Sequence, residues 1–330
     1  MISKIIFVVW LISFVFASTH SAQAQQPKKI PRIGFVSGSG DPKTSERYVE
    51  SFRQGFRDLG YIEGKNILVE YRFMEETVDS IPSLVAELVR LKVDVLVVGP
   101  LIAIRAAKQA TKTIPIVMVA SFDPIETGIV DSLARPGGNI TGVATLGREL
   151  GGNRLELLKE AVPGITRVGL LADADAPIRA IAFKEYEAVA SPLKIQLQYL
   201  EVRGPNPDLE GAFQAAIKGR TNALITVSNP LLSRYQKQIA RLTIKNRTPS
   251  MCEATSYVEA GCLMSYSTNS ADQYRRTATY VDKILKGTKP ADLPVEQPTK
   301  FEFLINLKSA KEIGLTIPPN VLVRADKVIK

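Results

Sequence analysis

Two patterns of apolar residues alternate along most of the chain. Continuous apolar runs at 93–98 and 114–120 are typical of strands buried on both faces of a parallel sheet. Elsewhere apolar residues recur every three to four positions, as Val49, Phe52 and Phe56 do, which predicts amphipathic helices. The alternation predicts repeated strand–helix–strand units, and right-handed crossovers make the strands of such units parallel.

The pattern occurs twice. The first series predicts strands at 30–37, 66–71, 93–98 and 114–120. It also predicts one helix that ends at Gly60 and further helices at 80–91, 101–110 and 124–134. The second predicts strands at 166–172, 194–202, 223–228, 249–252 and 262–266, and helices near 151–162, 178–190, 207–218 and 230–245. Turn-forming residues at 136–139 separate the two series. We therefore predict an α/β fold with two doubly wound parallel-sheet lobes.

The lobe boundaries follow from this division. Residues 25–143 form the expected N-terminal lobe, and 144–269 form the C-terminal lobe. A helix at 270–287 follows the last strand of the second series, and we expect it to complete the first lobe. Residues 288–330 contain an apolar segment at 301–305, and we expect a crossover segment followed by a tail.

The N-terminus predicts export. Lys4 precedes an apolar run at 5–17, and a polar patch then ends in Ala22-Gln23-Ala24. This order is that of a secretory signal cleaved after Ala24. A membrane anchor needs about 20 apolar residues, more than this run supplies. Residues 1–24 are therefore expected to be removed, which places the mature protein in the periplasm.

Composition excludes several classes of function. The only His and the only Trp, His20 and Trp10, lie in the expected signal. The mature chain therefore lacks the commonest general base and zinc ligand, so we expect no enzyme, metal site or cofactor. The net charge is +9, yet basic residues are scattered and form no stripe with aromatics. Nucleic-acid binding is therefore not expected. We also expect the protein to be a monomer.

A family resemblance joins these features. The residues that carry it are Gly34-Phe-Val-Ser37, Gly60-Tyr-Ile-Glu-Gly-Lys-Asn66, Ser121-Phe-Asp-Pro124, Pro136-Gly-Gly-Asn-Ile-Thr-Gly142, Ser265-Tyr-Ser-Thr-Asn269 and Ile305-Asn-Leu-Lys308. From about residue 30 onward the chain resembles ABC transporter substrate-binding proteins of the type I periplasmic fold, in a family that includes aromatic amino-acid binders. The resemblance implies two lobes joined by three crossover strands, a small-molecule solute such as an amino acid or aromatic compound, and an ABC permease as partner.

The carboxyl ends of the expected strands locate the ligand site, because ligands of open parallel sheets bind there. Polar residues at these ends and on the crossover are the candidates: Ser37, Ser39, Ser121, Asp123, Thr145, Asp173, Ser228, Asn229, Glu253 and Tyr266. Such a set suits a zwitterion or an amide, with a ring packed on Phe122 or Tyr266. Glu253 follows an apolar strand directly, and we expect its charge to point into the cleft.

Each candidate has a purely structural alternative. The Ser residues are equally suited to cap helices, and Asp123-Pro124 is typical of a cap followed by proline at the first helical position. Asp173 and Asp175 suit a ligand, a solvated loop or, least of the three, a metal. Tyr266 suits the cleft rim or hinge packing. At the level of function, a sensor that docks to a membrane receptor and a secreted Ser-Lys hydrolase remain as alternatives.

Two cysteines allow one disulfide. Export and the even count favour a bond between Cys252 and Cys262. Geometry opposes it, because one Cys ends a strand and the other begins the next strand of a parallel pair, whereas a disulfide needs Cα atoms within about 7 Å. We predict free thiols.

Overall fold

The first series of apolar runs forms a five-stranded sheet in the computed structural model, which describes residues 29–37, 42–74, 78–145, 147–227 and 229–330. All its strands are parallel, in the order β2-β1-β3-β4-β5. Their bounds are β1 (Arg32–Ser37), β2 (Leu68–Phe73), β3 (Val95–Val98), β4 (Ile116–Ala120) and β5 (Ile140–Ala144). The expected signal at 1–24 lies outside the described residues.

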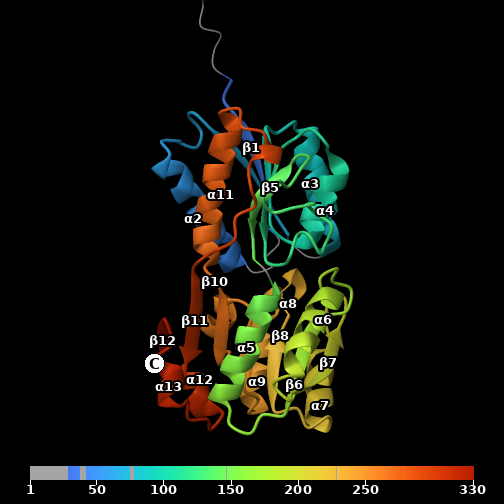
Figure 1. The fold of residues 1–330 in the computed structure, drawn as a ribbon, viewed down its shortest axis with the longest axis vertical. Helices are drawn as coiled ribbons and strands as arrows, with labels where there is room; N and C mark the ends of the chain where they lie inside the picture. Colours follow the sequence, from blue (N-terminus) through green and yellow to red (C-terminus); the bar gives the residue numbers. More distant parts are fainter. Residues whose placement is uncertain (1–28, 38–41, 75–77, 146, 228) are drawn as a thin grey trace, which may run out of the picture. The chain divides into compact units, whose positions relative to one another are not determined.

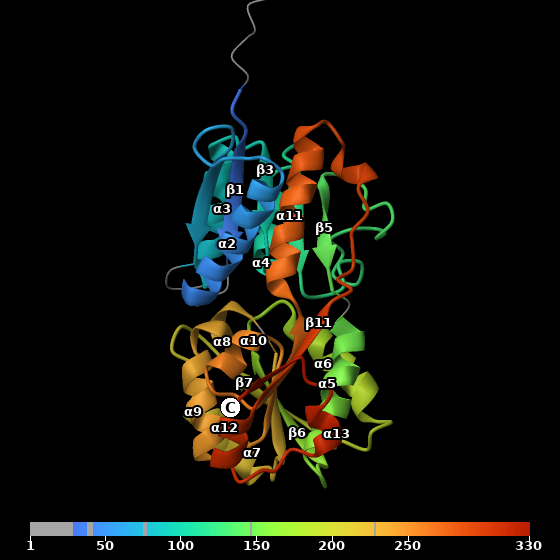
Figure 2. The same cartoon turned by 90° about the vertical axis from the view of Figure 1, so that its left-hand side faces the viewer.

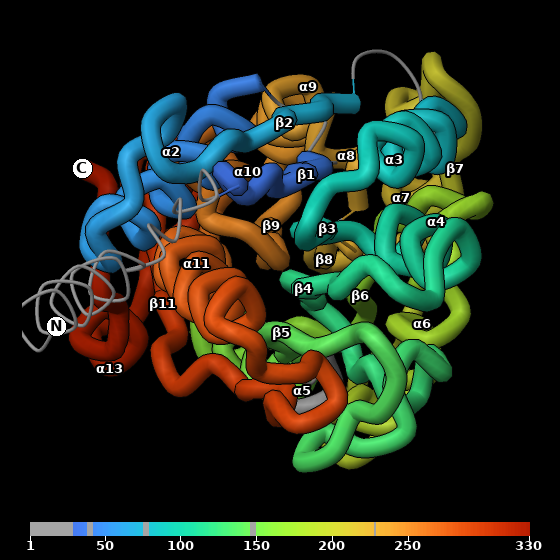
Figure 3. Tube along the Cα trace, turned by 90° about the horizontal axis from the view of Figure 1, so that it is seen from above, coloured from blue at the N-terminus to red at the C-terminus, as the bar shows by residue number. Residues whose placement is uncertain are grey.

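Helices cover both faces of this sheet, as Figure 3 shows from above. The helical elements of the first lobe are α2 (Pro42–Asp58), η1 (Val78–Ser80), α3 (Ile81–Arg90), α4 (Leu101–Ala110), α11 (Ser270–Leu285) and η2 (Pro290–Asp292). Helices α3 and α4 pack on the face that carries Leu96 and Met118. Helices α2 and α11 pack on the face that carries Phe35 and Val97. Successive strand residues thus enter separate cores, which explains the continuous apolar runs.

The second series forms a seven-stranded sheet with the order β12-β11-β10-β9-β8-β6-β7. Strand β11 is antiparallel to β10, and the remaining neighbours are parallel. The bounds are β6 (Arg167–Asp173), β7 (Gln196–Val202), β8 (Ala223–Thr226), β9 (Ser250–Cys252), β10 (Met264–Thr268), β11 (Phe301–Asn306) and β12 (Lys327–Ile329). The C-terminal segment therefore extends the second sheet (Figure 1).

Helices also cover both faces of the second sheet. Their bounds are α5 (Gly147–Ala161), α6 (Arg179–Ala190), α7 (Leu209–Lys218), α8 (Pro230–Arg234), α9 (Gln236–Lys245), α10 (Thr255–Glu259), α12 (Leu307–Glu312) and α13 (Pro319–Leu322). Residues of α5, α6, α12 and α13 share one core, and residues of α7 to α10 share the other. Two doubly wound α/β lobes result, as predicted.

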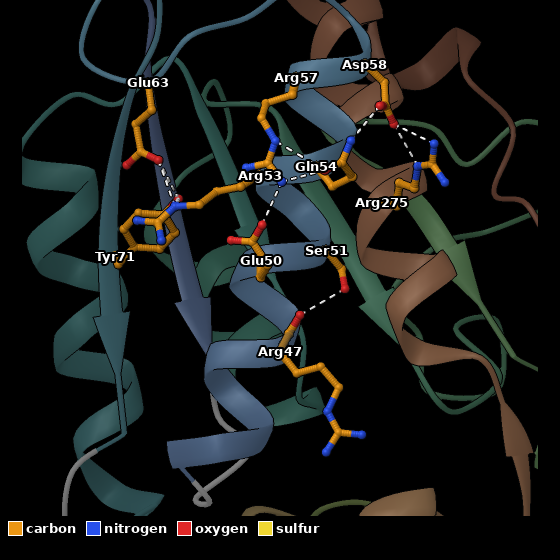
Figure 4. A network of polar contacts seen from close by, with 10 residues as sticks. All are labelled: Arg47, Glu50, Ser51, Arg53, Gln54, Arg57, Asp58, Glu63, Tyr71 and Arg275. Carbon is orange, nitrogen blue, oxygen red and sulfur yellow. Dashed lines mark hydrogen bonds and ion pairs between the residues drawn. The ribbon is translucent and has the colours of Figure 1, made fainter.

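Helix α11 follows a strand of the second sheet but packs on the first sheet, against α2 (Figure 2). The two helices approach closely at Gly55, where a Cβ atom would lie 2.4 Å from the carbonyl oxygen of Arg275. Any larger residue there would push the helices apart. An ion pair between Arg275 and Asp58, 2.6 Å long, ties the outer faces of the same two helices (Figure 4).

The helix predicted at 124–134 is wrong. One turn forms, in which the backbone N–H of Thr127 donates to the carbonyl of Asp123 at 3.1 Å. Gly128 then takes φ +68°, and the N–H groups of Ile129 and Val130 both return to the carbonyl of Pro124. The left-handed glycine ends the helical path, as it does at helix C-termini. The segment continues as turns to β5.

Both cysteines are free and buried, as predicted. Burial raises the pKa of the Cys252 thiol well above its ordinary value, so little thiolate is present to react. We expect almost no reaction of the native protein with a chromogenic aromatic disulfide at pH 8. Denaturation without reductant should release two thiols, and a pre-reduced sample gives the reference count. Release of no thiols would contradict the free state.

Within the described parts of the chain, no helix combines the length and the apolar character that a membrane span requires.

Candidate functional site

A cavity of about 320 Å³ lies where the carboxyl ends of strands from both sheets meet. Residues after β3 and β4 contribute one wall, together with the first turns of α2 and α11. Residues after β6, β8 and β9 contribute the other wall. Pro31–Lys330 pack as a single unit that contains both walls. The cavity is therefore large enough for one small organic molecule, at the position that parallel α/β sheets favour.

Aromatic side chains form part of the wall from the first lobe. The rings of Tyr48 and Tyr274 stack with centroids 4.5 Å apart and an angle of 20° between their planes. Both residues line the cavity, as does Phe122. Gly99 leaves room for this arrangement, because a Cβ atom there would lie 2.9 Å from the Tyr274 hydroxyl. The wall therefore offers an apolar, planar surface to an aromatic or aliphatic group.

A buried carboxyl group faces the cavity from the second lobe. Asp173 ends β6, lines the cavity and is 6% exposed. Its Oδ1 accepts a hydrogen bond from the backbone N–H of Asp175 at 3.0 Å. Burial raises the pKa of Asp173 above its ordinary value. A cation in the cavity would offset the free-energy cost of burying the charged carboxylate, so this side chain suits an ammonium group.

Asn229 presents a hydrogen-bond donor whose direction is fixed. Its Oδ1 accepts from the backbone N–H of Leu232 at 2.8 Å and so caps α8. The Nδ2 amide group is consequently turned away from the helix. It is buried and has no hydrogen-bond partner among the described residues, although Asn229 lines the cavity. A buried donor without an acceptor is costly, so this amide suits an acceptor atom supplied by a ligand.

The start of α4 adds further donors. Pro100 occupies the N-cap position, and its side chain makes no capping hydrogen bond. Leu101 and Ile102, in its first turn, line the cavity. The positive end of the helix dipole and its first N–H groups favour an anion, and this preference agrees with the donor of Asn229.

The structure separates the predicted site residues into three groups. Those that line the cavity are Ser121, Asp173 and Asn229. Those outside the described residues are Ser39 and Ser228. Those that do not line the described cavity are Ser37, Asp123, Thr145, Glu253 and Tyr266.

The third group has structural partners. Ser37 Oγ donates to Ser45 Oγ at 3.0 Å. Asp123 Oδ1 caps the following turn by accepting from the N–H of Ile125 at 2.7 Å. Tyr266 stacks on Phe301 with ring centroids 5.9 Å apart. The contacts of Asp123 and Tyr266 correspond to the cap and the hinge packing named as alternatives above, whereas Ser37 pairs with a side-chain hydroxyl and does not cap a helix through this bond.

The structure corrects the expected orientation of Glu253. Its Oε1 accepts from Arg154 Nη1 at 2.8 Å and from the Tyr186 hydroxyl at 2.7 Å, so the carboxylate belongs to a network with two buried side chains that do not line the cavity. Burial, followed by the charges of Glu253 and Glu126, raises the pKa of the nearby Glu185 to about 7. The ion pair with Arg154, 99 positions away in the chain, holds the Glu253 side chain away from the cavity.

Several residues that line the cavity belong to helices and not to strand ends, so the sequence-based candidates did not include them. Tyr48, Gln273 and Tyr274 line the cavity from the first two turns of α2 and α11. A polar or aromatic residue in the first two turns of a helix that follows a strand is the signal that identifies such positions, since helix N-termini adjoin the same edge of the sheet. Among the described residues, no group of three or more His, Cys, Asp or Glu side chains is placed to hold a metal ion.

Two α/β lobes, each built on a sheet of mainly parallel strands, with a cavity at the carboxyl ends of those strands, define the type I periplasmic binding fold. The sequence pattern of the ABC transporter substrate binding protein family matches residues 34–329, and the chain belongs to this family. A curated relative, the "Tyrosine-binding protein" of Clostridioides difficile (strain R20291), is 23% identical over 292 residues, which cover 87% of this chain and 82% of the relative.

Two solved structures are also similar. A conserved domain protein of Vibrio cholerae O1 biovar El Tor superposes with a TM-score of 0.82 and 26% identity. The ABC domain in complex with L-Trp from Streptococcus pneumonia superposes with a TM-score of 0.79 and 26% identity. Each match covers 91% of this chain and 100% of the other. Proteins of this family bind small solutes and deliver them to an ABC permease, and they are typically extracytoplasmic.

Proposed function

We propose that this protein is the exported, periplasmic solute-binding component of an ABC importer and that its solute is an amino acid with an aromatic side chain. The observation that carries the proposal is the composition of one cavity. Asp173 suits the ammonium, the amide of Asn229 suits the carboxylate, and the paired rings of Tyr48 and Tyr274 suit the side chain. The L-Trp complex and the name of the tyrosine-binding relative support the same class of solute.

Thermal unfolding with a matched panel tests this proposal. The panel contains L-tyrosine, L-tryptophan, tyramine (no carboxylate) and N-acetyl-L-tyrosine (no ammonium). A solute at 100 times its dissociation constant stabilises the protein by about 2.7 kcal/mol. We expect a rise in melting temperature with an intact amino acid and none with either derivative at equal concentration. An equal rise with tyramine would contradict the role of the carboxylate, and no rise with any compound would contradict the proposal.

Closure of the lobes over the solute forms part of the proposal, and one ion pair marks the closed arrangement. Arg47 of α2 binds Glu259 of α10 through two hydrogen bonds of 3.0 and 2.8 Å, although the residues are 212 positions apart. Figure 4 shows the Arg47 side chain pointing away from the other labelled side chains of α2. Since α2 and α10 belong to different lobes, opening must break this pair.

Breaking the pair should therefore favour the open form. Both side chains are about one-third exposed, and exposed pairs contribute about 0.2–1 kcal/mol. We expect Glu259→Gln to weaken solute affinity by about two- to fivefold at low salt, mainly through faster dissociation, and to have less effect at high salt. Glu50→Gln is the matched control, because it breaks the pair with Arg57 within α2. Surface plasmon resonance measures the association and dissociation rates. Equal effects of the two variants would contradict a role of the Arg47–Glu259 pair in holding the lobes closed.

A further inference from the structure

Gln273 lies where the cavity meets the segments that connect the two lobes. It is 5% exposed and lines the cavity from the first turn of α11. Its Nε2 donates to Thr145 Oγ1 at 3.1 Å, and its Oε1 accepts from Thr268 Oγ1 at 3.3 Å. One amide group therefore engages both hydroxyls and leaves little freedom for its own orientation.

The two threonines belong to different crossovers. Thr145 follows β5 on the first connection between the sheets, and Thr268 ends β10 on the second. A third connection precedes β11, and backbone bonds attach it to both others. The N–H of Ala144 donates to the carbonyl of Glu296 at 2.9 Å, and the N–H of Asn269 donates to that of Lys300 at 3.3 Å. The amide of Gln273 is thus a side-chain link between the first two crossovers, and among the described residues the backbone bonds join these two through the third.

We infer that Gln273 is a positioning residue that couples occupation of the cavity to the hinge of the protein, an inference that rests on the proposed function. Hinge closure requires the crossover residues to change their backbone angles together. The Gln273 amide holds two crossovers in one relative position. A solute that contacts this amide stabilises the orientation in which both hydroxyls are bound, and thereby favours the crossover arrangement seen here. The free energy of solute binding then shifts the equilibrium between open and closed lobes, because the Gln273 amide contacts two of the segments that join the lobes.

Substitutions at the threonines separate this role from plain solute contact, because neither Thr145 nor Thr268 lines the cavity. Thr145→Val and Thr268→Val keep the shape of each side chain and remove one hydrogen bond to Gln273. With L-tyrosine as the probe, we expect each to lower affinity by about three- to tenfold, the effect of one net hydrogen bond. Gln273→Leu should lower it further, and Gln273→Leu with Thr145→Val should be no weaker than Gln273→Leu alone.

Thr141→Val is the matched control. Thr141 is a buried threonine of the same strand β5, and its hydroxyl donates to the carbonyl of Leu293 at 2.7 Å without reaching Gln273. Its loss should lower the melting temperature while leaving solute affinity within twofold. A general loss of packing in this region would instead weaken binding in the control and in Thr145→Val alike, and would overturn the inference.

A measurement without solute completes the test. Nitroxide labels on Lys112→Cys and Lys218→Cys, both exposed and one on each lobe, report the distance between lobes by double electron–electron resonance. We expect a narrow distribution in the otherwise unchanged protein and in Thr141→Val, and a broader one in Thr145→Val and Gln273→Leu. Unchanged distributions in both latter variants would show that Gln273 does not act on the hinge. This readout decides the inference even if L-tyrosine fails to bind, an outcome that counts against the proposed function alone.

Discussion

Replacing Asp173 by Asn is expected to reduce amino-acid affinity by about 10- to 100-fold. The carboxylate is buried at the cavity wall, and a charge-assisted hydrogen bond to an ammonium contributes about 1.5–3 kcal/mol. The amide oxygen of Asn can still accept from the N–H of Asp175, so the loop should keep its conformation. Isothermal titration with L-tyrosine measures the loss.

The same substitution should stabilise the solute-free protein. Burial raises the folded-state pKa of Asp173, so the folded state binds this proton more tightly than the unfolded state does. The resulting stabilisation is complete below the unfolded pKa and is lost as pH rises through the folded pKa. At pH 7, Asp173→Asn removes a buried negative charge and should raise the melting temperature. The variant should also lose the part of the pH dependence that lies between the two pKa values.

Asp175→Asn provides the control for this prediction. Asp175 lies in the same loop and also lines the cavity, but its side chain is exposed. The charge change is identical, whereas water screens the carboxylate, so we expect less than a threefold change in affinity. A large loss in Asp175→Asn together with a small one in Asp173→Asn would place the ammonium elsewhere.

The fold could be predicted from sequence because its strands are buried on both faces. The run at 116–120 has no polar position, and its alternate residues fill separate cores on the two sides of the sheet. The helix predicted at 101–110 is confirmed with the same bounds. The predicted helix at 230–245 divides at Tyr235, which has φ −100° and ψ 12° and ends α8 before α9 begins. Local backbone geometry of this kind leaves no trace in hydrophobic periodicity.

The site was only partly predictable, because its geometry depends on contacts between distant segments. Strand ends pointed to Asp173 and Asn229, since Asp173 follows an apolar run directly and Asn229 follows the strand predicted at 223–228. Tyr274 belongs to a predicted helix with an apolar face, but its stacking on Tyr48 requires that helix to return to the first sheet. The direction of Glu253 likewise depended on Arg154. Pairing between residues far apart in sequence is a property of the folded chain alone.

Asn229→Asp should separate the two tasks of Asn229, because only one of them needs the amide nitrogen. Asp caps helices as well as Asn does, and its charge favours the N-terminal end of α8. The cap should therefore be kept, while the carboxylate at this buried position should lower the unfolding stability at pH 7 through the cost of burying a charge. The Nδ2 donor is replaced by a negatively charged oxygen that repels a solute carboxylate. Affinity for L-tyrosine should fall at least about 30-fold, beyond the loss of one neutral hydrogen bond.

Two further variants determine whether the donor or the cap is responsible. Asn229→Ala removes both, so it should lose about 1 kcal/mol of stability and bind more weakly than the original protein, yet more tightly than Asn229→Asp. Asp208→Asn exchanges the same two residue types at the N-cap of α7, away from the cavity, and should change neither property appreciably. Calorimetry measures stability and affinity on the same samples. Undiminished affinity in Asn229→Asp would mean that the buried amide does not meet the solute, and the carboxylate would then have to bind at the uncapped start of α4 alone.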